Sequence, residues 1–245
     1  MRKGEETRTR ILDVAEAAVL QKGFGGTSIE ELIAETGITK SGFFYHFRDK
    51  NELAKALLNR YIDNDERIYD EIFGRARDLT GDPLQSFLLG LKLLSELLSD
   101  LPNGHPGCLV ATVCYYERLF DREIQETNRN AVLAWRRRFG RMLREIMEVY
   151  PPREPVDVDQ LADMVSSVLE GGIVLSKTLK EPNTLAEQVL MLRTFVKMLF
   201  LPVVEMPRAQ SNSSKSAKRL CWNCADILSP RPPTPPPSPR ACVRC

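Results

Sequence analysis

Hydrogen-bonding side chains are concentrated in residues 38–50, which read I-T-K-S-G-F-F-Y-H-F-R-D-K. The segment holds no acid before Asp49, but it carries hydroxyl groups, basic groups, an imidazole and three phenylalanines. Donors of this kind can bond base edges and phosphate oxygens, and no nearby carboxylate repels the phosphates. The chemistry that the segment offers is therefore that of a DNA groove contact.

Two short helices are predicted to position these groups. Ser28 and Glu31 fit a capping box ahead of apolar residues at helical spacing. Gly37 suits the tight turn that ends this helix, and Thr39 can cap the next one. The arrangement predicts a helix-turn-helix, whose second helix would enter the major groove and present its start to the base edges.

The aromatic residues of the second helix are predicted to anchor it. Phe44 and Phe47 lie three residues apart, so we expect them to share the face that packs on a core. Tyr45 and His46 are then left toward solvent.

A longer pattern spans residues 23–53 and reads G-F-x-x-T-S-I-x-x-L-I-A-x-x-G-I-T-K-S-G-F-F-Y-H-F-x-x-K-x-x-L. It resembles the DNA-binding signature of the TetR/AcrR family of bacterial transcriptional regulators. The resemblance implies base contacts from the start of the second helix and phosphate contacts around it: Thr39, Lys40, Ser41 and Gly42 for bases, and Thr27, Ser28, Tyr45, His46 and Lys50 for phosphates. Phe43 is left open, because it would either touch a thymine methyl or pack.

The chain reads as helix after helix, which predicts an all-α protein. We expect a helix-turn-helix DNA-binding domain at 1–50 and a helical ligand-binding and dimerisation domain at 51–205, followed by a linker and a Pro/Cys-rich tail at 206–245 that is disordered. The family resemblance implies a homodimer through residues 156–201, where Gly171 and Gly172 would permit close approach of the helices. Packing within one core is the alternative for these helices.

In the family a small molecule binds among the body helices and releases the DNA. The candidate ligand residues are apolar or aromatic positions on these helices: Phe87, Leu91, Cys108, Val113, Tyr115, Tyr116, Trp135 and Phe139. Each of them could equally be core. The sequence does not identify the ligand.

Cys108 supports a separate hypothesis of electrophile or oxidant sensing. It stands at a predicted helix start, where the helix dipole would lower the pKa of its thiol, and His105 is near in sequence. The segment G-C-L also resembles the one that carries the sensor cysteine in electrophile-sensing family members. The alternative is a small buried apolar residue.

The charge and the composition of the chain argue against several classes of protein. The 245 residues carry a formal net charge of only +1, and residues 1–205 hold 27 basic against 32 acidic residues, or −5. This argues against nonspecific nucleic-acid packaging and requires a local basic patch for DNA binding. With two histidines and no nucleophile elbow, phosphate-binding glycine loop or metal-binding histidine pair, we expect no enzyme. We find neither a signal peptide nor an apolar run long enough for a membrane, and expect a cytoplasmic protein.

A cluster of arginines on a later helix could be interpreted as a second nucleic-acid-binding surface. It comprises Arg136, Arg137, Arg138, Arg141 and Arg144. The favoured interpretation is a solvated face paired with acids such as Glu145 and Glu148.

The tail contains two C-x-x-C pairs, Cys221 with Cys224 and Cys242 with Cys245. Four cysteines at this spacing could bind zinc, but the proline-rich stretch between them can hardly form a supporting hairpin. A disordered extension, derived from an alternative reading frame or a vector, is the other interpretation. No other cofactor is expected.

The sequence therefore predicts a dimeric repressor that binds a palindromic double-stranded DNA operator. Release would follow the binding of a small-molecule or electrophile inducer. A nonspecific nucleic-acid-binding protein, or a zinc-binding interaction protein acting through the tail, are the alternatives.

Overall fold

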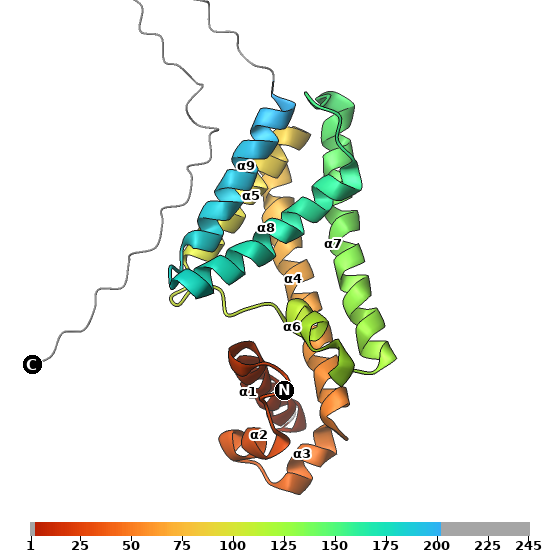
Figure 1. The fold of residues 1–245 in the computed structure, drawn as a ribbon, viewed down its shortest axis with the longest axis vertical. Helices are drawn as coiled ribbons and strands as arrows, with labels where there is room; N and C mark the ends of the chain where they lie inside the picture. The colour runs from red at the N-terminus through yellow and green to blue at the C-terminus, as the bar shows by residue number, and fades with distance from the viewer. Residues whose placement is uncertain (1–2, 202–245) are drawn as a thin grey trace, which may run out of the picture. The chain divides into compact units, whose positions relative to one another are not determined.

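The structure, a computed structural model, describes residues 3–201 of the 245-residue chain. These residues form α-helices and one 3-10 helix, and no strand occurs among them, so the all-α expectation is confirmed. The elements, shown in Figure 1, are α1 (Lys3–Lys22), α2 (Ile29–Thr36), α3 (Lys40–His46), α4 (Lys50–Thr80), α5 (Pro83–Ser99), α6 (Leu109–Tyr115), η1 (Glu117–Leu119), α7 (Arg122–Val149), α8 (Val158–Leu179) and α9 (Thr184–Phe200). No helix in this part of the chain is both long enough and apolar enough to cross a membrane.

The predicted caps bound the helix-turn-helix. Ser28 accepts a hydrogen bond from the backbone N–H of Glu31 at 3.1 Å, and Thr39 accepts one from Gly42 at 3.1 Å. Each bond satisfies a backbone donor that the first helical turn leaves without a partner. Gly37 ends α2 with φ 66°, a left-handed conformation that glycine adopts without strain. The turn between α2 and α3 is thus built from local signals.

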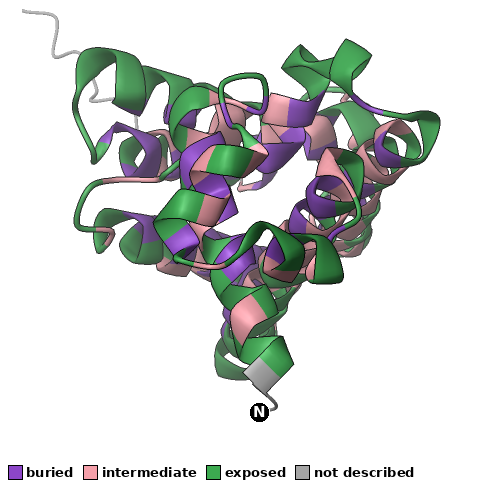
Figure 2. Ribbon diagram, turned by 90° about the horizontal axis from the view of Figure 1, so that it is seen from below, coloured by how far each residue is buried: buried purple, intermediate pink, exposed green. Residues whose placement is uncertain are grey.

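One hydrophobic core lies among the second half of α4 and helices α5, α7, α8 and α9. Leu91, Phe139, Leu143 and Val165 are at most 1% exposed at its centre. Figure 2 shows the buried faces of the helices turned toward one another and the exposed faces turned outward. This core holds helices α4, α5, α7, α8 and α9 together as the body of the protein.

A second core joins α1, α2 and α3 to the first half of α4, to α6 and to the start of α7. Ile11 of α1, Phe47 after α3 and Leu57 of α4 are completely buried in it, and Val113 of α6 is 3% exposed. Hydrophobic contacts therefore run across residue 50, and the domain limits at 50 and 205 stay predictions. The proposed tail, residues 206–245, lies outside the described residues.

The aromatic anchor of α3 differs from the prediction. Phe43 and Phe47 are completely buried, with ring centroids 5.9 Å apart, whereas Phe44 is 41% exposed. A spacing of four residues completes a helical turn more nearly than a spacing of three, so Phe43 and not Phe44 shares the buried face. The expectation of a Phe44 and Phe47 pair was wrong.

Gly172 serves packing within one subunit. A Cβ atom on it would lie 2.6 Å from Cδ1 of Leu185 in α9, so the missing side chain lets α8 and α9 approach. Gly171 is exposed and has open space where its Cβ would be. The close approach that we expected between subunits is therefore found between α8 and α9 of the same chain at Gly172.

Candidate functional site

The start of α3 is an exposed hydrogen-bonding surface. Lys40 and Ser41 are exposed in its first turn, and Tyr45 follows with 83% of its surface accessible. The hydroxyl groups of Thr39 and Ser41 lie 3.1 Å apart. No acid occurs in α3, so hydroxyl, ammonium and phenol groups share one surface without a carboxylate on that helix. An α-helix bearing such groups fits the width of a DNA major groove.

Two predicted contact residues have buried side chains. Phe43 is completely buried, so the alternative in which it packs is correct and the thymine contact does not fit. Thr27 is 2% exposed, and its hydroxyl donates to the carbonyl of Gly23 at 3.0 Å. Its predicted phosphate contact does not fit either, because the hydroxyl already holds the turn before α2.

The remaining predicted contacts surround the exposed start of α3. Ser28 is exposed at the start of α2, and the half-buried His46 packs edge-on against Tyr45 with ring centroids 5.0 Å apart. Lys50 is half-buried and donates to the carbonyl of Phe24 at 2.5 Å. Burial lowers the pKa of Lys50. Its ammonium group thus ties α4 to the segment between α1 and α2, and its phosphate contact stays a prediction.

Helices α1, α2 and α3 are here called the head, and the helices after them the body. A cavity of about 690 Å³ lies among α1, α4, α5, α6, α7, α8 and α9. Its volume is in the range that accommodates a drug-sized molecule, and most of its lining is apolar or aromatic. Three of the eight predicted ligand residues line it: Cys108, Tyr115 and Trp135. The described part of the chain therefore contains a cavity large enough for a small molecule, and ligand binding there stays a prediction.

The other five predicted ligand residues do not line this cavity: Phe87, Leu91, Val113, Tyr116 and Phe139. Leu91 and Phe139 lie in the core of the body, and Val113 lies in the core of the head. Apolar periodicity finds buried helix faces, but it does not distinguish a filled core from the wall of a cavity. These five expectations were therefore misplaced.

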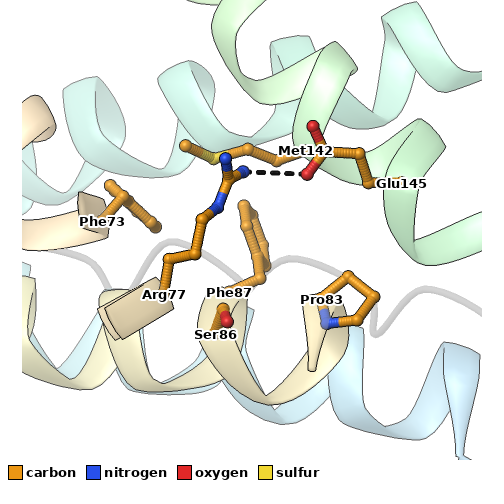
Figure 3. A pocket seen from close by; sticks show the side chains of 7 residues that line it. All are labelled: Phe73, Arg77, Pro83, Ser86, Phe87, Met142 and Glu145. Atoms are coloured by element: carbon orange, nitrogen blue, oxygen red, sulfur yellow. Dashed lines mark hydrogen bonds and ion pairs between the residues drawn. The ribbon is translucent and has the colours of Figure 1, made fainter. Parts of the chain in front are cut away.

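Phe87 lines a second, much smaller hollow between α4, α5 and α7 (Figure 3). Its volume is about 20 Å³, and Arg77 and Glu145 form an ion pair of 2.8 Å within it. This space is comparable with a single water molecule. It is too small to be the site of an inducer.

Cys108 caps α6 as predicted, but its thiol is not activated. The sulfur accepts a weak hydrogen bond from the N–H of Ala111 at 3.4 Å, which lowers the pKa. Burial outweighs this contribution and raises the pKa of the Cys108 thiol to about 12. The expectation of a lowered pKa was wrong, because desolvation exceeds the effect of the helix start.

His105 does not assist the thiol either. Its Nδ1 accepts a hydrogen bond from the N–H of Gly107 at 3.2 Å. Burial, together with the charge of Lys177, lowers the pKa of His105 to about 4. The imidazole is therefore neutral at physiological pH and supplies no positive charge to stabilise a thiolate.

Asp65 of α4 is the most perturbed carboxyl group of the cavity wall. Burial, followed by the charges of Glu66 and Glu16, raises the pKa of Asp65 to about 7. Glu66 is paired with Arg138, and Glu16 with Arg60. Asp65 itself makes no hydrogen bond or ion pair within residues 3–201. A partly buried carboxyl group without a partner is costly to ionise, because it loses part of its hydration.

This carboxyl group predicts a pH-dependent stability. An unfolded chain loses the Asp65 proton near pH 3.8, whereas the folded protein retains it up to about pH 7. The folded state therefore binds more protons between these values and loses stability as the pH rises through them. We expect Asp65→Asn to stabilise the protein at pH 8 by on the order of 2–4 kcal/mol, and by little near pH 4.

Urea unfolding from pH 4 to pH 8 at one protein concentration measures this difference. Asp63→Asn is the matched control, because Asp63 is exposed on the same helix and does not line the cavity. A gain in stability that is the same at all pH values, or that the Asp63 variant shares, would contradict the assignment.

Three contacts link the cavity to the head. Glu16 and Leu20 of α1 line the cavity, and Lys177 of α8 donates to the carbonyl of Leu20 at 3.4 Å. Beyond α6, the ring of Tyr116 packs so closely on Gly23 that a Cβ there would lie 3.0 Å from it. Gly23 also has φ 79°, so glycine is required at this point for two reasons. A shift of α1 or α6 would therefore move the helix-turn-helix.

Three arginines of the cluster form ion pairs, but their partners lie on other helices, and Arg138 is not solvated because its side chain is only 11% exposed. Arg136 forms a two-bonded ion pair with Asp163 of α8, and Arg144 bonds Asp159 at 2.8 Å. Arg138 pairs with Glu66 and Asp70 of α4. The expected partners Glu145 and Glu148 do not take part in these pairs.

Sequence reasoning missed the polar residues of the cavity wall. The carboxylates are Glu16, Asp65 and Glu170, and the aromatic residues include Tyr61 and Tyr69. Asp65 stands in the sequence D-N-D-E, which is typical of a solvated helix face. Only the packing of α4 against α6 and α7 distinguishes it from its exposed neighbours.

No cluster of potential metal ligands occurs within residues 3–201. The cysteines predicted to bind zinc are Cys221, Cys224, Cys242 and Cys245. They lie outside the described residues, so a zinc site in the tail stays a prediction.

Comparison with known proteins identifies the helix-turn-helix. Residues 11–57 match the family model described as bacterial regulatory proteins, tetR family. The chain is 26% identical over 189 residues to the uncharacterized HTH-type transcriptional regulator YxaF of Bacillus subtilis, which covers 75% of this chain and 93% of YxaF. It is also 26% identical over 149 residues to the HTH-type transcriptional regulator AcrR of Shigella flexneri, covering 60% of this chain and 66% of AcrR.

Solved structures share the whole helical fold. A TetR family regulator from Agrobacterium tumefaciens aligns with a TM-score of 0.68 at 16% identity, covering 81% of this chain and 100% of that chain. A regulatory protein TetR from Rhodobacter sphaeroides aligns with a TM-score of 0.64 at 22% identity, covering 78% of this chain and 97% of that chain. The names of these relatives describe transcriptional regulators, and none of them describes an enzyme. The helix-turn-helix of this chain is therefore that of the TetR-family DNA-binding transcriptional regulators, and its helices share the fold of solved members of that family.

Proposed function

We propose that two copies of this chain form a dimeric repressor, which binds a near-palindromic operator in the cytoplasm and is released when a small molecule enters the cavity. The observation that carries the proposal is the exposed first turn of α3. Lys40, Ser41 and Tyr45 stand outward there, while Phe43 and Phe47 hold the helix on the core of the head. A rigidly held reading helix is what sequence recognition requires.

Exposed apolar residues on α8 and α9 support a dimer. The two helices pack side by side (Figure 1), and their outer faces carry Val174, Leu175, Leu179, Met191, Phe195 and Met198, each at least 39% exposed. A contiguous apolar patch is costly in water and marks an interface. Two such helices can pair with their copies in a four-helix bundle.

A two-fold dimer would define the form of the operator. Its two α3 helices would enter successive major grooves, on the order of 34 Å apart, so the two half-sites would read as an inverted repeat. Base contacts from Thr39, Lys40, Ser41 and Gly42 would determine which operator sequence the protein recognises. Phosphate contacts would set the register.

The contacts between cavity and head support release by a ligand. The cavity wall includes α1 and α6, which also pack on the helix-turn-helix. A molecule that fits a different spacing of these helices would bind one arrangement of the heads better than the other. The dimer would then no longer match the groove spacing.

Selection from a random pool of duplex DNA on the purified full chain tests the DNA-binding part. The salt concentration is fixed, because phosphate contacts make affinity salt-dependent. We expect an inverted repeat that a Lys40→Ala/Tyr45→Ala variant does not recover. If the folded wild-type dimer enriched no sequence, the proposed operator recognition would be wrong.

A reporter gene behind the recovered operator tests the direction of regulation. Repression predicts lower expression in the presence of the wild-type protein than in the presence of the double variant. Higher expression would identify an activator. The negative charge of residues 1–205 argues against nonspecific binding as the main activity.

A further inference from the structure

The cavity of about 690 Å³ has an acidic wall. Three carboxylates line it, from Glu16, Asp65 and Glu170, and within residues 3–201 no lysine or arginine does. The rest of the wall is mainly apolar and aromatic. A charge of one sign in a low-dielectric wall favours an occupant of the opposite sign.

The three carboxylates differ in what already neutralises them. Glu16 is paired with Arg60. Glu170 lies beside the thiol of Cys108 and within reach of the charge of Lys177. Asp65 makes no hydrogen bond or ion pair within residues 3–201, and the charges that act on it from Glu66 and Glu16 are both negative. Asp65 is therefore the group of the wall that a bound cation would stabilise most.

Two further polar atoms of the wall lack partners. Nε1 of Trp135 and Oδ1 of Asn128 are buried without a hydrogen bond, and both residues stand on α7 in the cavity lining. Both atoms are shielded from the open volume by their neighbours, so they mark no ligand contact in the present arrangement of the wall.

We propose, building on the role of this cavity as the inducer site, that its ligand is an organic cation with an apolar, partly aromatic body, whose charge faces Asp65. The apolar wall buries the body of the ligand. The aromatic rings of Tyr61 and Tyr115 also line the cavity, and an aromatic face attracts a cation. The carboxylate replaces the hydration that the cation loses.

Other ligand classes fit the wall less well. An anion of the same size would face three carboxylates and no lining lysine or arginine. A neutral molecule would displace water from Asp65 without giving the carboxylate a partner. The sign of the ligand charge is therefore the property that the structure determines.

Two probes of opposite charge and nearly identical shape test this. Tetraphenylphosphonium and tetraphenylborate are titrated separately into the full-length protein at pH 8 by calorimetry. We expect the phosphonium to bind at least about tenfold more tightly than the borate, because only the cation gains from the carboxylate. Equal or tighter binding of the borate would overturn the proposal.

Matched variants locate the charge. Asp65→Asn keeps the shape of the side chain and removes its charge, whereas Asp63→Asn removes an exposed charge that does not line the cavity. The first variant should lose about tenfold in phosphonium affinity, and the second should lose little. Unchanged phosphonium binding by Asp65→Asn would contradict the role of Asp65, and the thermal unfolding of each variant shows that it is folded.

DNA release is measured separately, so that the two proposals can fail independently. Calorimetry alone decides the charge of the cavity ligand, whether or not the protein binds an operator. If the phosphonium binds as expected but leaves an operator complex intact, the ligand class stands and the inducer role falls. If the phosphonium does not bind and the operator complex forms, the ligand class falls and the regulator role stands.

Discussion

Replacing Lys40 by alanine should weaken operator binding and relax its sequence preference. Lys40 is exposed in the first turn of α3, and no ion pair engages it within residues 3–201. A lysine at this place can donate to the O6 and N7 acceptors of guanine. Loss of such a contact costs about 1–3 kcal/mol per half-site, so a dimer should lose roughly 30-fold or more in operator affinity.

Fluorescence anisotropy on the selected operator and on a scrambled duplex measures both effects. Lys92→Ala is the matched control, because Lys92 is exposed on α5, where it pairs with Glu96 at 3.0 Å. If Lys40 contacted only a phosphate, both duplexes would lose affinity equally and the salt dependence would fall. An unchanged ratio of specific to scrambled affinity would therefore remove Lys40 from the base-reading residues.

The helix-turn-helix was predictable because its signals are local. Ser28, Gly37 and Thr39 cap or end helices through bonds that span three or four residues, and the sequence contains each partner. The face of α3 was harder to predict. Phe43 and Phe44 are adjacent phenylalanines, and only the position of the second core decides which one is buried with Phe47.

The cavity was less predictable because its wall comes from helices far apart in the sequence. Cys108, Tyr115 and Trp135 were found because they are apolar or aromatic residues on the body helices. Leu91 and Phe139 have the same character but fill the core. Asp65 could not be found at all, since a charged residue in an acidic run normally faces solvent.

Burial, which the sequence does not reveal, also explains why the pKa of the Cys108 thiol was predicted wrongly. A helix start lowers a thiol pKa, and this effect could be predicted from the sequence. The opposing effect is desolvation, which depends on the packing of the cavity wall and raises the pKa to about 12. Local geometry was predicted correctly here, but burial decided the outcome.

The substitution Phe195→Glu should have the second large effect, because Phe195 lies on the proposed dimer surface. Phe195 is 39% exposed on α9, between Met191 and Met198, which are 61% and 60% exposed. If these side chains are buried between two subunits, a carboxylate among them lies in an apolar interface without a partner. The charge should therefore separate the subunits without unfolding them, because Phe195 is outside the buried core of the body.

Sedimentation should then show Phe195→Glu as a folded monomer at concentrations where the wild type is a dimer. A monomer reads only one half-site, and the loss of the linked second contact should reduce operator affinity by about 10²- to 10⁴-fold. Lys197→Glu is the control, since Lys197 is exposed on the same helix but points away from the apolar face, and it should remain dimeric. A Phe195→Glu protein that stayed dimeric and bound the operator normally would move the interface away from α9. A monomer that kept full operator affinity would instead show that recognition needs only one α3 helix, which is incompatible with an inverted repeat.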